Sequence, residues 1–214
     1  MRRLIAFAFA LLVVCTHSVV SQETPPASKQ TVYDFSLVDL DGKVVSLSAY
    51  KGKVLLVVNL ASKSEYRDQI EALSDLSKTY SGQGLVVLGI PSSDFGGEEL
   101  KDPAALHDYY LNTAKVTFTV FAPAKLTGPG AIPLYKFLTD PKAGLPGGDL
   151  HWNFTKFLID RNGKPLARYE VGEDPADVDF HVIVEKALAG KFKKPGAGGK
   201  EAPAAGDDDD GPDR

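Results

Sequence analysis

The sequence is poor in sulfur, because its 214 residues include one cysteine and one methionine. The cysteine, Cys15, lies in an N-terminal apolar run, so a chain that loses this run has no thiol. Such a chain forms no disulfide, offers no thiolate nucleophile and binds no metal through cysteine. Thiol chemistry is therefore excluded from the remainder of the chain.

The sequence also has no excess of positive charge. Its formal net charge at pH 7 is −4, and no basic amphipathic segment stands out, so we expect no nucleic-acid partner. A hydrophobic content of 43% with 24% charged residues is ordinary for a globular protein. His107 and His181 do not have metal-ligand spacing, so we expect neither a metal nor a cofactor.

The N-terminus has the order of a secretory signal peptide. Two arginines precede an apolar run that ends at Cys15, and small or β-branched residues continue to Ser21. The run is short for a membrane span, so we expect a signal peptide of residues 1–21, export to the periplasm or the extracellular space, and no stable membrane insertion. A retained anchor is one alternative. A lipid on Cys15 is another, but bulky Val14 before the cysteine argues against it.

Composition divides the remainder into three parts. Residues 22–30 form a polar, proline-containing linker, and residues 31–190 form one domain. Residues 191–214 are glycine, alanine, proline and charge with almost nothing apolar to bury, so we expect a disordered polar and acidic tail. Its run Asp207–Asp210 is a calcium-site alternative, but four adjacent carboxylates repel one another and lack a fixed cage. A solubilising role is the simpler interpretation.

Hydrophobic patterns predict the elements of the domain. Asp41–Gly42 and Asn162–Gly163 each separate two apolar runs, which indicates two hairpins. Residues 53–60 and 85–90 read as strands buried on both faces, joined by an amphipathic helix that ends near Tyr80. In chain order we further expect Pro91 to break the second strand, a helix over 102–112, a short extended piece over 116–121, a helical turn over 131–138 and a last helix from Asp174 or Pro175 to Leu188. This order describes an α/β domain.

Several strings of the domain resemble successive landmarks of the glutathione peroxidase family, which has a thioredoxin-like fold. In order between Tyr33 and Leu188 they are "VVNLASKSEY", "GIPSSDFGGEE", "VTFTVF", "PLYKFL" and "WNFTKFLIDRNGKPLARY". The resemblance implies a central mixed β-sheet with helices on both faces and an N-terminal β-hairpin. The short segment 139–150 resembles the compact, monomeric members. The family also implies a hydroperoxide substrate and a thiol reductant, glutathione or thioredoxin.

The resemblance assigns the candidate site residue by residue. In the family, the turn after the first buried strand carries cysteine or selenocysteine, whose anion attacks the peroxide, with a Gln, a Trp and an Asn around it. Here Ser64 stands at the chalcogen position and Asp94 at the Gln position, whereas Trp152 and Asn153 match. Ser92 stands where a further cysteine often lies. The helix predicted over 102–112 lacks the second cysteine with which many selenium-free members regenerate.

These replacements predict a loss of function. Peroxide reduction needs a soft atom that takes up oxygen as a sulfenic or selenenic acid and is then reduced, and the Ser64 hydroxyl has no such step. The Asp94 carboxylate, within about 4–6 Å of an anion, would oppose its formation. We therefore expect an exported family member without peroxidase activity. The alternative is the function that the family implies, a thiol-dependent hydroperoxide reductase in the oxidative-stress response.

Other interpretations of the same residues remain open. Ser64, Asp94 and His151 have the residue types of a hydrolase triad. Against this, His151 precedes Trp152 on a strand-like segment, so the two side chains should point to opposite faces, and Ser64 lacks flanking glycines. Ser64 is also a candidate helix N-cap, and Asp94 a cap of the turn before Phe95. A third class is a binding module that keeps the pocket and has lost the chemistry.

Overall fold

The computed structural model describes residues 29–194. The expected signal peptide with Cys15, most of the linker, and the tail from residue 195 with its acidic run lie outside the described residues. Within the described range, none of the helices combines the length and the hydrophobicity that a membrane crossing needs.

A five-stranded mixed sheet forms the centre of the fold, in the order β5-β4-β3-β6-β7. Its strands are β3 (Val54–Leu60), β4 (Leu85–Pro91), β5 (Thr119–Val120), β6 (Lys156–Ile159) and β7 (Pro165–Tyr169). β3 runs parallel to β4, and β4 runs parallel to β5, whereas β6 is antiparallel to both of its neighbours. Every residue of β3 is buried, as its nearly continuous apolar run predicts for a strand covered on both faces.

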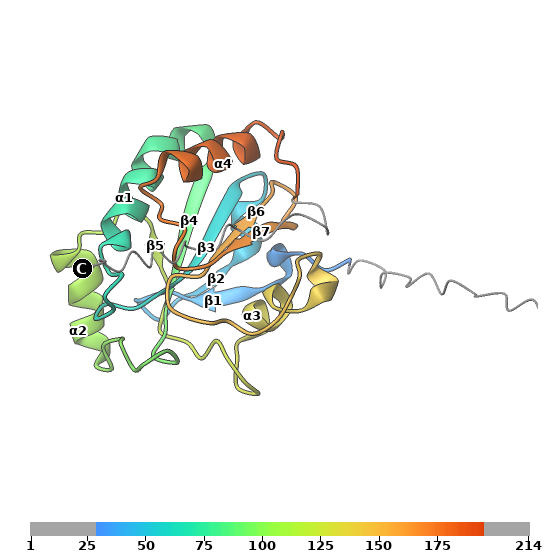
Figure 1. Cartoon of the computed structure of the whole chain (residues 1–214). Helices are drawn as coiled ribbons and strands as arrows, with labels where there is room; N and C mark the ends of the chain where they lie inside the picture. The colour runs from blue at the N-terminus through green and yellow to red at the C-terminus, as the bar shows by residue number, and fades with distance from the viewer. Residues whose placement is uncertain (1–28, 195–214) are drawn as a thin grey trace, which may run out of the picture.

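Two layers cover the sheet (Figure 1). Helices α1 (Gln69–Tyr80) and α4 (Val178–Leu188) lie on one face, and the hairpin of β1 (Ser36–Val38) and β2 (Val44–Ser46) lies with α3 (Pro133–Leu138) on the other. Alternate residues of β3 divide between the two cores: Leu56 and Val58 pack under α1 and α4, and Leu55 and Val57 pack under the hairpin and α3. The predicted fold class is therefore confirmed.

Both predicted hairpins are present and close with the same five-residue turn, Asp-x-Asp/Asn-Gly-Lys. In the first turn, Asp39 Oδ1 accepts from the backbone N–H groups of Asp41 at 3.0 Å and Lys43 at 2.8 Å. In the second, the Oδ1 atom of Asp160 accepts from the corresponding N–H groups two and four residues later, both at 2.8 Å. The glycines, Gly42 and Gly163, have φ of 82° and 79°, a region that other residues rarely adopt.

Arg161, in the second turn, holds together the end of the sheet where β3 and β4 begin. Its guanidinium donates to the carbonyl oxygen of Gly52 at 2.7 Å, and to those of Gln83 and Leu188 at 3.2 Å each. Gly52 precedes β3, Gln83 precedes β4, and Leu188 is the last residue of α4. We call this set of contacts the Arg161 clamp.

The last helix begins later than predicted. α4 starts at Val178, with Asp177 at its N-cap, and not at Asp174 or Pro175. Asp174 instead closes a separate turn, because its carboxylate accepts from Ala176 N at 2.9 Å and its carbonyl accepts from Asp177 N at 3.0 Å. Proline at the second position suits such a turn as well as it suits a helix start, so the sequence signal was ambiguous.

Two further boundaries differ from the prediction. The helix expected over 102–112 is α2 (Pro103–Asp108) followed by the π-helical turn η4 (Tyr109–Thr113), because Ala114 N donates to Tyr109 O, five residues back. Pro91 does not break β4 but is its last residue, paired with Leu60. At a strand end, the missing proline N–H leaves the earlier ladder hydrogen bonds intact.

Candidate functional site

Ser64 lies in the connection between β3 and α1 and is fully buried. Its prediction as a helix N-cap is wrong, because α1 begins five residues later, at Gln69. Successive i+3 hydrogen bonds, such as Arg67 N to Ser64 O at 3.2 Å, fold this segment into turns that become α-helical only at Gln69. Ser64 Oγ accepts from Tyr66 N at 3.3 Å, so the hydroxyl stabilises its own turn.

Asp94 follows β4, and its carboxylate holds a distant loop. Oδ2 accepts from the backbone N–H groups of Leu126 at 2.7 Å and Thr127 at 2.9 Å, and from Thr127 Oγ1 at 3.1 Å. The interpretation of Asp94 as a cap of the turn before Phe95 is therefore wrong. Ser92 performs that function, because its Oγ accepts from Asp94 N at 3.3 Å.

Trp152 is half-buried against the core beneath the hairpin and α3. Its carbonyl oxygen accepts from Asn59 Nδ2 at 3.1 Å, so the Trp152 backbone is attached to the carboxyl end of β3. The segment is not strand-like, as the sequence suggested, but a bend: Phe154, two residues on, has φ of 60°. A bulky residue rarely adopts this left-handed conformation, and it is held here by burial of the ring and by a hydrogen bond from Phe154 N to Asn59 O at 2.8 Å.

Asn153 is fully buried and contacts a carboxylate. Its Nδ2 donates to Glu98 Oε2 at 2.7 Å, with Phe95 O at 3.5 Å. Glu98 is also tied to the Ser64 turn, because Lys63 N donates to Glu98 O at 2.8 Å. The loop that follows β4 therefore connects the Ser64 turn with Asn153, at the carboxyl ends of β3 and β4.

His151 does not join this group. Its side chain is 77% exposed, and its Nδ1 lies 3.8 Å from Glu170 Oε2. No hydrogen bond joins it to the fully buried Ser64 within residues 29–194. A triad needs the base within hydrogen-bond reach of the nucleophile, so the geometry gives no support to the hydrolase interpretation.

Glu99 forms a buried network that sequence reasoning missed. The side chain is 1% exposed, and its carboxylate accepts from Ser62 Oγ, from Leu100 N at 2.7 Å and from Tyr110 OH at 2.6 Å. Burial and the nearby Glu99 raise the pKa of Tyr110 well above its usual value. The string "FGGEE" showed two acidic residues, but its spacing could not indicate that one carboxylate is enclosed in the fold.

Lys156, in β6, is a second buried charge that the sequence did not indicate. Its Nζ donates to the carbonyl oxygens of Phe154 at 2.9 Å and Glu170 at 3.4 Å. Burial lowers its pKa to about 8, against the smaller opposing effects of Glu173, Asp174 and Glu170. The ammonium stabilises the bend after Asn153 through Phe154, so its role here is structural.

The described part of the chain contains no group of three His, Cys, Asp or Glu side chains that could hold a metal ion. His107 lies 3.4 Å from Asp41, and His181 contacts Tyr80 OH through Nδ1 at 3.1 Å. The two histidines therefore belong to separate pairs.

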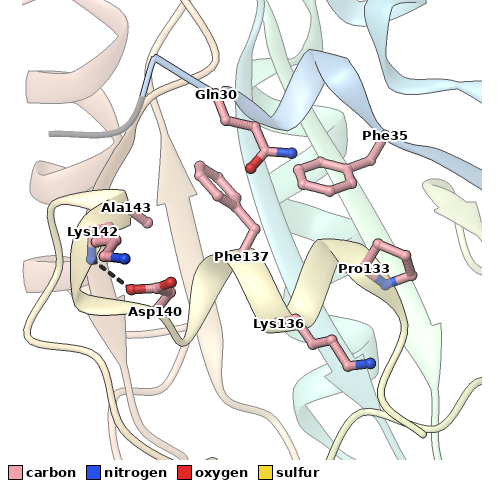
Figure 2. Close-up of a pocket in the computed structure, with 8 residues that line it drawn as sticks. All are labelled: Gln30, Phe35, Pro133, Lys136, Phe137, Asp140, Lys142 and Ala143. Atoms are coloured by element: carbon pink, nitrogen blue, oxygen red, sulfur yellow. Dashed lines mark hydrogen bonds between the residues drawn. The ribbon is translucent and has the colours of Figure 1, made fainter. Parts of the chain in front are cut away.

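One hollow of the surface lies between the N-terminal segment and α3 (Figure 2). It has a volume of about 360 Å³, and Figure 2 shows the rings of Phe35 and Phe137 with Gln30 above α3. The remaining lining residues are Pro133, Lys136, Asp140, Lys142 and Ala143. None of the four predicted site residues lines this hollow, so its size alone does not make it the site of the chemistry.

The strand order and the layers on the two faces of the sheet define a thioredoxin-like fold. A thiol:disulfide interchange protein of the thioredoxin family from Chlorobium tepidum TLS matches with a TM-score of 0.56, over 78% of this chain and 99% of its own. Its sequence identity is 23%, so this likeness concerns the fold alone.

Sequence comparison then defines the family. The sequence model of the glutathione peroxidase family matches residues 32–139. The glutathione peroxidase of Lactococcus lactis subsp. cremoris is 42% identical over 150 residues, which cover 70% of this chain and 96% of the relative. A probable phospholipid hydroperoxide glutathione peroxidase of Solanum lycopersicum is 38% identical over 161 residues, 73% of this chain and 93% of the relative. The crystal structure of Trgpx in apo form matches with a TM-score of 0.60 and 34% identity, over 76% of this chain and 97% of its own. The chain belongs to the glutathione peroxidase family.

Proposed function

We propose that this chain is an exported member of the glutathione peroxidase family that does not reduce peroxides. The observation that carries the proposal is the serine in the connection from β3 to α1, where the family places its reacting sulfur or selenium. In peroxide reduction the attacking atom takes up one oxygen from the hydroperoxide, and thiols then remove it. The Ser64 oxygen has no corresponding oxidised state.

The surroundings of Ser64 support the proposal. The side chain is fully buried, and its hydroxyl is engaged by Tyr66 N. The Asp94 carboxylate, at the position of the family Gln, is occupied with Leu126 and Thr127. A carboxylate lacks the N–H group with which a Gln would stabilise an anion.

The names of the relatives favour a second candidate, a thiol-dependent hydroperoxide reductase. The Lactococcus lactis relative is named a glutathione peroxidase, and the Solanum lycopersicum relative is named a probable phospholipid hydroperoxide glutathione peroxidase. For this chain, that activity would require an external thiol that binds beside Trp152 and itself attacks the peroxide. The protein would then orient two small molecules without a covalent intermediate of its own.

A steady-state assay separates the two candidates. Purified wild-type protein is mixed with hydrogen peroxide or an organic hydroperoxide, with glutathione or reduced thioredoxin as reductant. The Lactococcus lactis relative tests whether the assay detects turnover, and Ser64→Ala tests whether any rate depends on the site. We expect no rate above the blank without protein. Turnover above that blank would refute the proposal in favour of the second candidate.

Without catalysis, the proposed role is binding of a small thiol or hydroperoxide by a monomer. Export is tested separately, by the mass of the N-terminal peptide of protein recovered from outside the cytoplasm. A peptide that begins at Gln22 supports export with cleavage, a retained Met1 in this protein supports the uncleaved anchor instead, and recovery from the cytoplasm alone contradicts export. Size-exclusion chromatography with light scattering tests the expected monomer.

A further inference from the structure

The amide group of Asn153 is bonded on one side and unpaired on the other. Its nitrogen donates to Glu98 Oε2 at 2.7 Å. Its oxygen, Oδ1, is buried and has no hydrogen-bond partner within residues 29–194. A hydrogen bond between an amide and a charged carboxylate is stronger than one between neutral groups. The Glu98 contact therefore determines which way the amide faces, even though one buried polar atom stays unpaired.

The backbone of Glu98 is held by hydrogen bonds at both its carbonyl and its N–H group. Its carbonyl oxygen accepts from Lys63 N at 2.8 Å, next to Ser64, and its N–H donates to Phe95 O at 3.4 Å. The backbone that carries the Glu98 carboxylate is thus attached to the turn that carries Ser64. Two other carboxylates of this loop are engaged elsewhere: Asp94 accepts from Leu126 and Thr127, and Glu99 accepts from Ser62 Oγ and Tyr110 OH.

We infer that Glu98 is a positioning residue, which holds the Asn153 amide nitrogen on its own carboxylate and so keeps this donor from an anion at position 64. The inference rests on the proposed function, because it takes position 64 as the place of the reacting atom. An anion there would be stabilised by N–H donors and opposed by a neighbouring carboxylate. Glu98 acts against it by engaging the Asn153 donor.

The test measures the acidity of a thiol placed at position 64. All variants carry Cys15→Ser, so that the introduced Ser64→Cys thiol is the only one in the chain. The fraction of thiolate is followed by its ultraviolet absorbance against pH, which does not require a reagent to reach a buried side chain. We expect the thiol pKa in Ser64→Cys/Glu98→Gln to be lower by about one unit than in Ser64→Cys.

Two controls separate positioning from charge. Glu65→Gln removes the same charge from the residue next to position 64, where no hydrogen bond to Asn153 is formed, and we expect it to give less than half of the Glu98→Gln shift. Asn153→Ala added to Ser64→Cys/Glu98→Gln should abolish most of the shift, because the released donor is gone. Equal pKa values in Ser64→Cys and Ser64→Cys/Glu98→Gln overturn the inference, and so does an equal shift from Glu65→Gln.

A further, conservative variant breaks the contact with Asn153 but keeps the carboxylate charge. Glu98→Asp keeps the charge and shortens the side chain by one methylene group, which breaks the 2.7 Å contact with Asn153. In Ser64→Cys/Glu98→Asp we expect a thiol pKa between those of Ser64→Cys and Ser64→Cys/Glu98→Gln. A value equal to that of Ser64→Cys contradicts the inference. These measurements do not depend on peroxide turnover, so an active wild type would refute the proposed function and leave the role of Glu98 decided by the thiol pKa.

Discussion

Asp94 and Thr127 are joined twice, because Asp94 Oδ2 accepts from the backbone N of Thr127 at 2.9 Å and from its hydroxyl at 3.1 Å. The same oxygen accepts from Leu126 N at 2.7 Å. One carboxylate thus connects the loop after β4 to the loop before α3, two segments more than thirty residues apart. The Asp94 side chain is therefore part of the scaffold that holds these two loops together.

Removal of this carboxylate should loosen the 126–127 loop. We expect Asp94→Ala to lower the free energy of unfolding by about 1–3 kcal/mol, because two backbone N–H groups lose a charged acceptor. Urea unfolding measures the loss, and hydrogen exchange should show faster exchange at Leu126 and Thr127. The matched control is Asp108→Ala, whose carboxylate accepts from one exposed side chain, Asn112. Equal losses in the two variants would contradict this role of Asp94.

The proposed function predicts that family residues introduced at positions 64 and 94 restore part of the chemistry. We expect no peroxidase turnover in the wild type, weak or no turnover in Ser64→Cys, and partial recovery in Ser64→Cys/Asp94→Gln. The rate of the double variant should exceed that of Ser64→Cys roughly tenfold, which corresponds to about one unit in the pKa of the thiol. Thermal unfolding of each variant shows whether the weaker loop contact alone changes the rate. If Ser64→Cys alone matches the double variant, Asp94 does not oppose the anion.

Lys156 should make the stability rise with pH in the alkaline range. Its pKa is about 8 in the folded protein and 10.5 ordinarily, so between these values the unfolded chain binds more protons and the folded state gains stability as pH rises. From pH 8 to pH 10 the gain from this group is about 2 kcal/mol. Above pH 10 the effect of Tyr169, whose pKa burial raises to about 12, has the opposite sign.

The comparison for this prediction is Lys156→Met, with the exposed Lys53→Met as control. Urea unfolding at pH 8, 9 and 10 should show the rise in the wild type and in Lys53→Met. Lys156→Met should be flatter over the same range by about 2 kcal/mol. Parallel curves for the wild type and Lys156→Met would show that the buried amine does not titrate in this window.

The two Asp-x-Asp/Asn-Gly-Lys turns allow backbone strain and steric contact to be measured separately. Gly42 and Gly163 have nearly the same φ, so alanine at either position should cost about 1–2 kcal/mol in backbone strain. A Cβ at Gly42 meets open space, whereas at Gly163 it lies 2.7 Å from the ring of Tyr33. We expect Gly163→Ala to be less stable than Gly42→Ala by about 1–3 kcal/mol in urea unfolding. Equal losses would show that the ring moves aside freely.

The Glu99 network predicts a cost for removing a single hydroxyl group. Tyr110→Phe deletes the donor 2.6 Å from Glu99 Oε2 and leaves a buried carboxylate with fewer partners. We expect a loss of about 1.5–3 kcal/mol in the free energy of unfolding. Tyr50→Phe is the control, because the Tyr50 hydroxyl has no hydrogen-bond partner within residues 29–194, and its loss should be near zero. A similarly small loss of unfolding free energy in both variants would contradict the proposed contribution of the Glu99 network to stability.

The sequence predicted the elements whose signals are local. The continuous apolar run of β3, the Asn162–Gly163 turn and the helix that ends at Tyr80 are all present. Boundaries were wrong where one residue type suits two structures. Pro175 starts a turn as readily as a helix, and Ser64 stabilises a turn as readily as a helix N-terminus.

The contacts of the candidate site could not be predicted, because they join residues far apart in the chain. Glu98 and Asn153 are separated by 55 positions, and nothing in either string shows that their side chains meet. The same holds for Asp94 and the loop at Leu126, and for the enclosure of Lys156. The resemblance named the residues at each position, but only the fold shows which partners they have taken.

The Arg161 clamp lies at the opposite end of the sheet from Ser64. It joins the starts of β3 and β4 to the end of α4, so the sheet is fastened at the end away from the candidate site residue Ser64. Natural variation and protein engineering can therefore exchange residues in the loops that follow β3 and β4, while the end of the sheet at Arg161 keeps its conformation. An end of the sheet held in this way is consistent with the proposal that position 64 lacks the reacting atom while the rest of the fold stays intact.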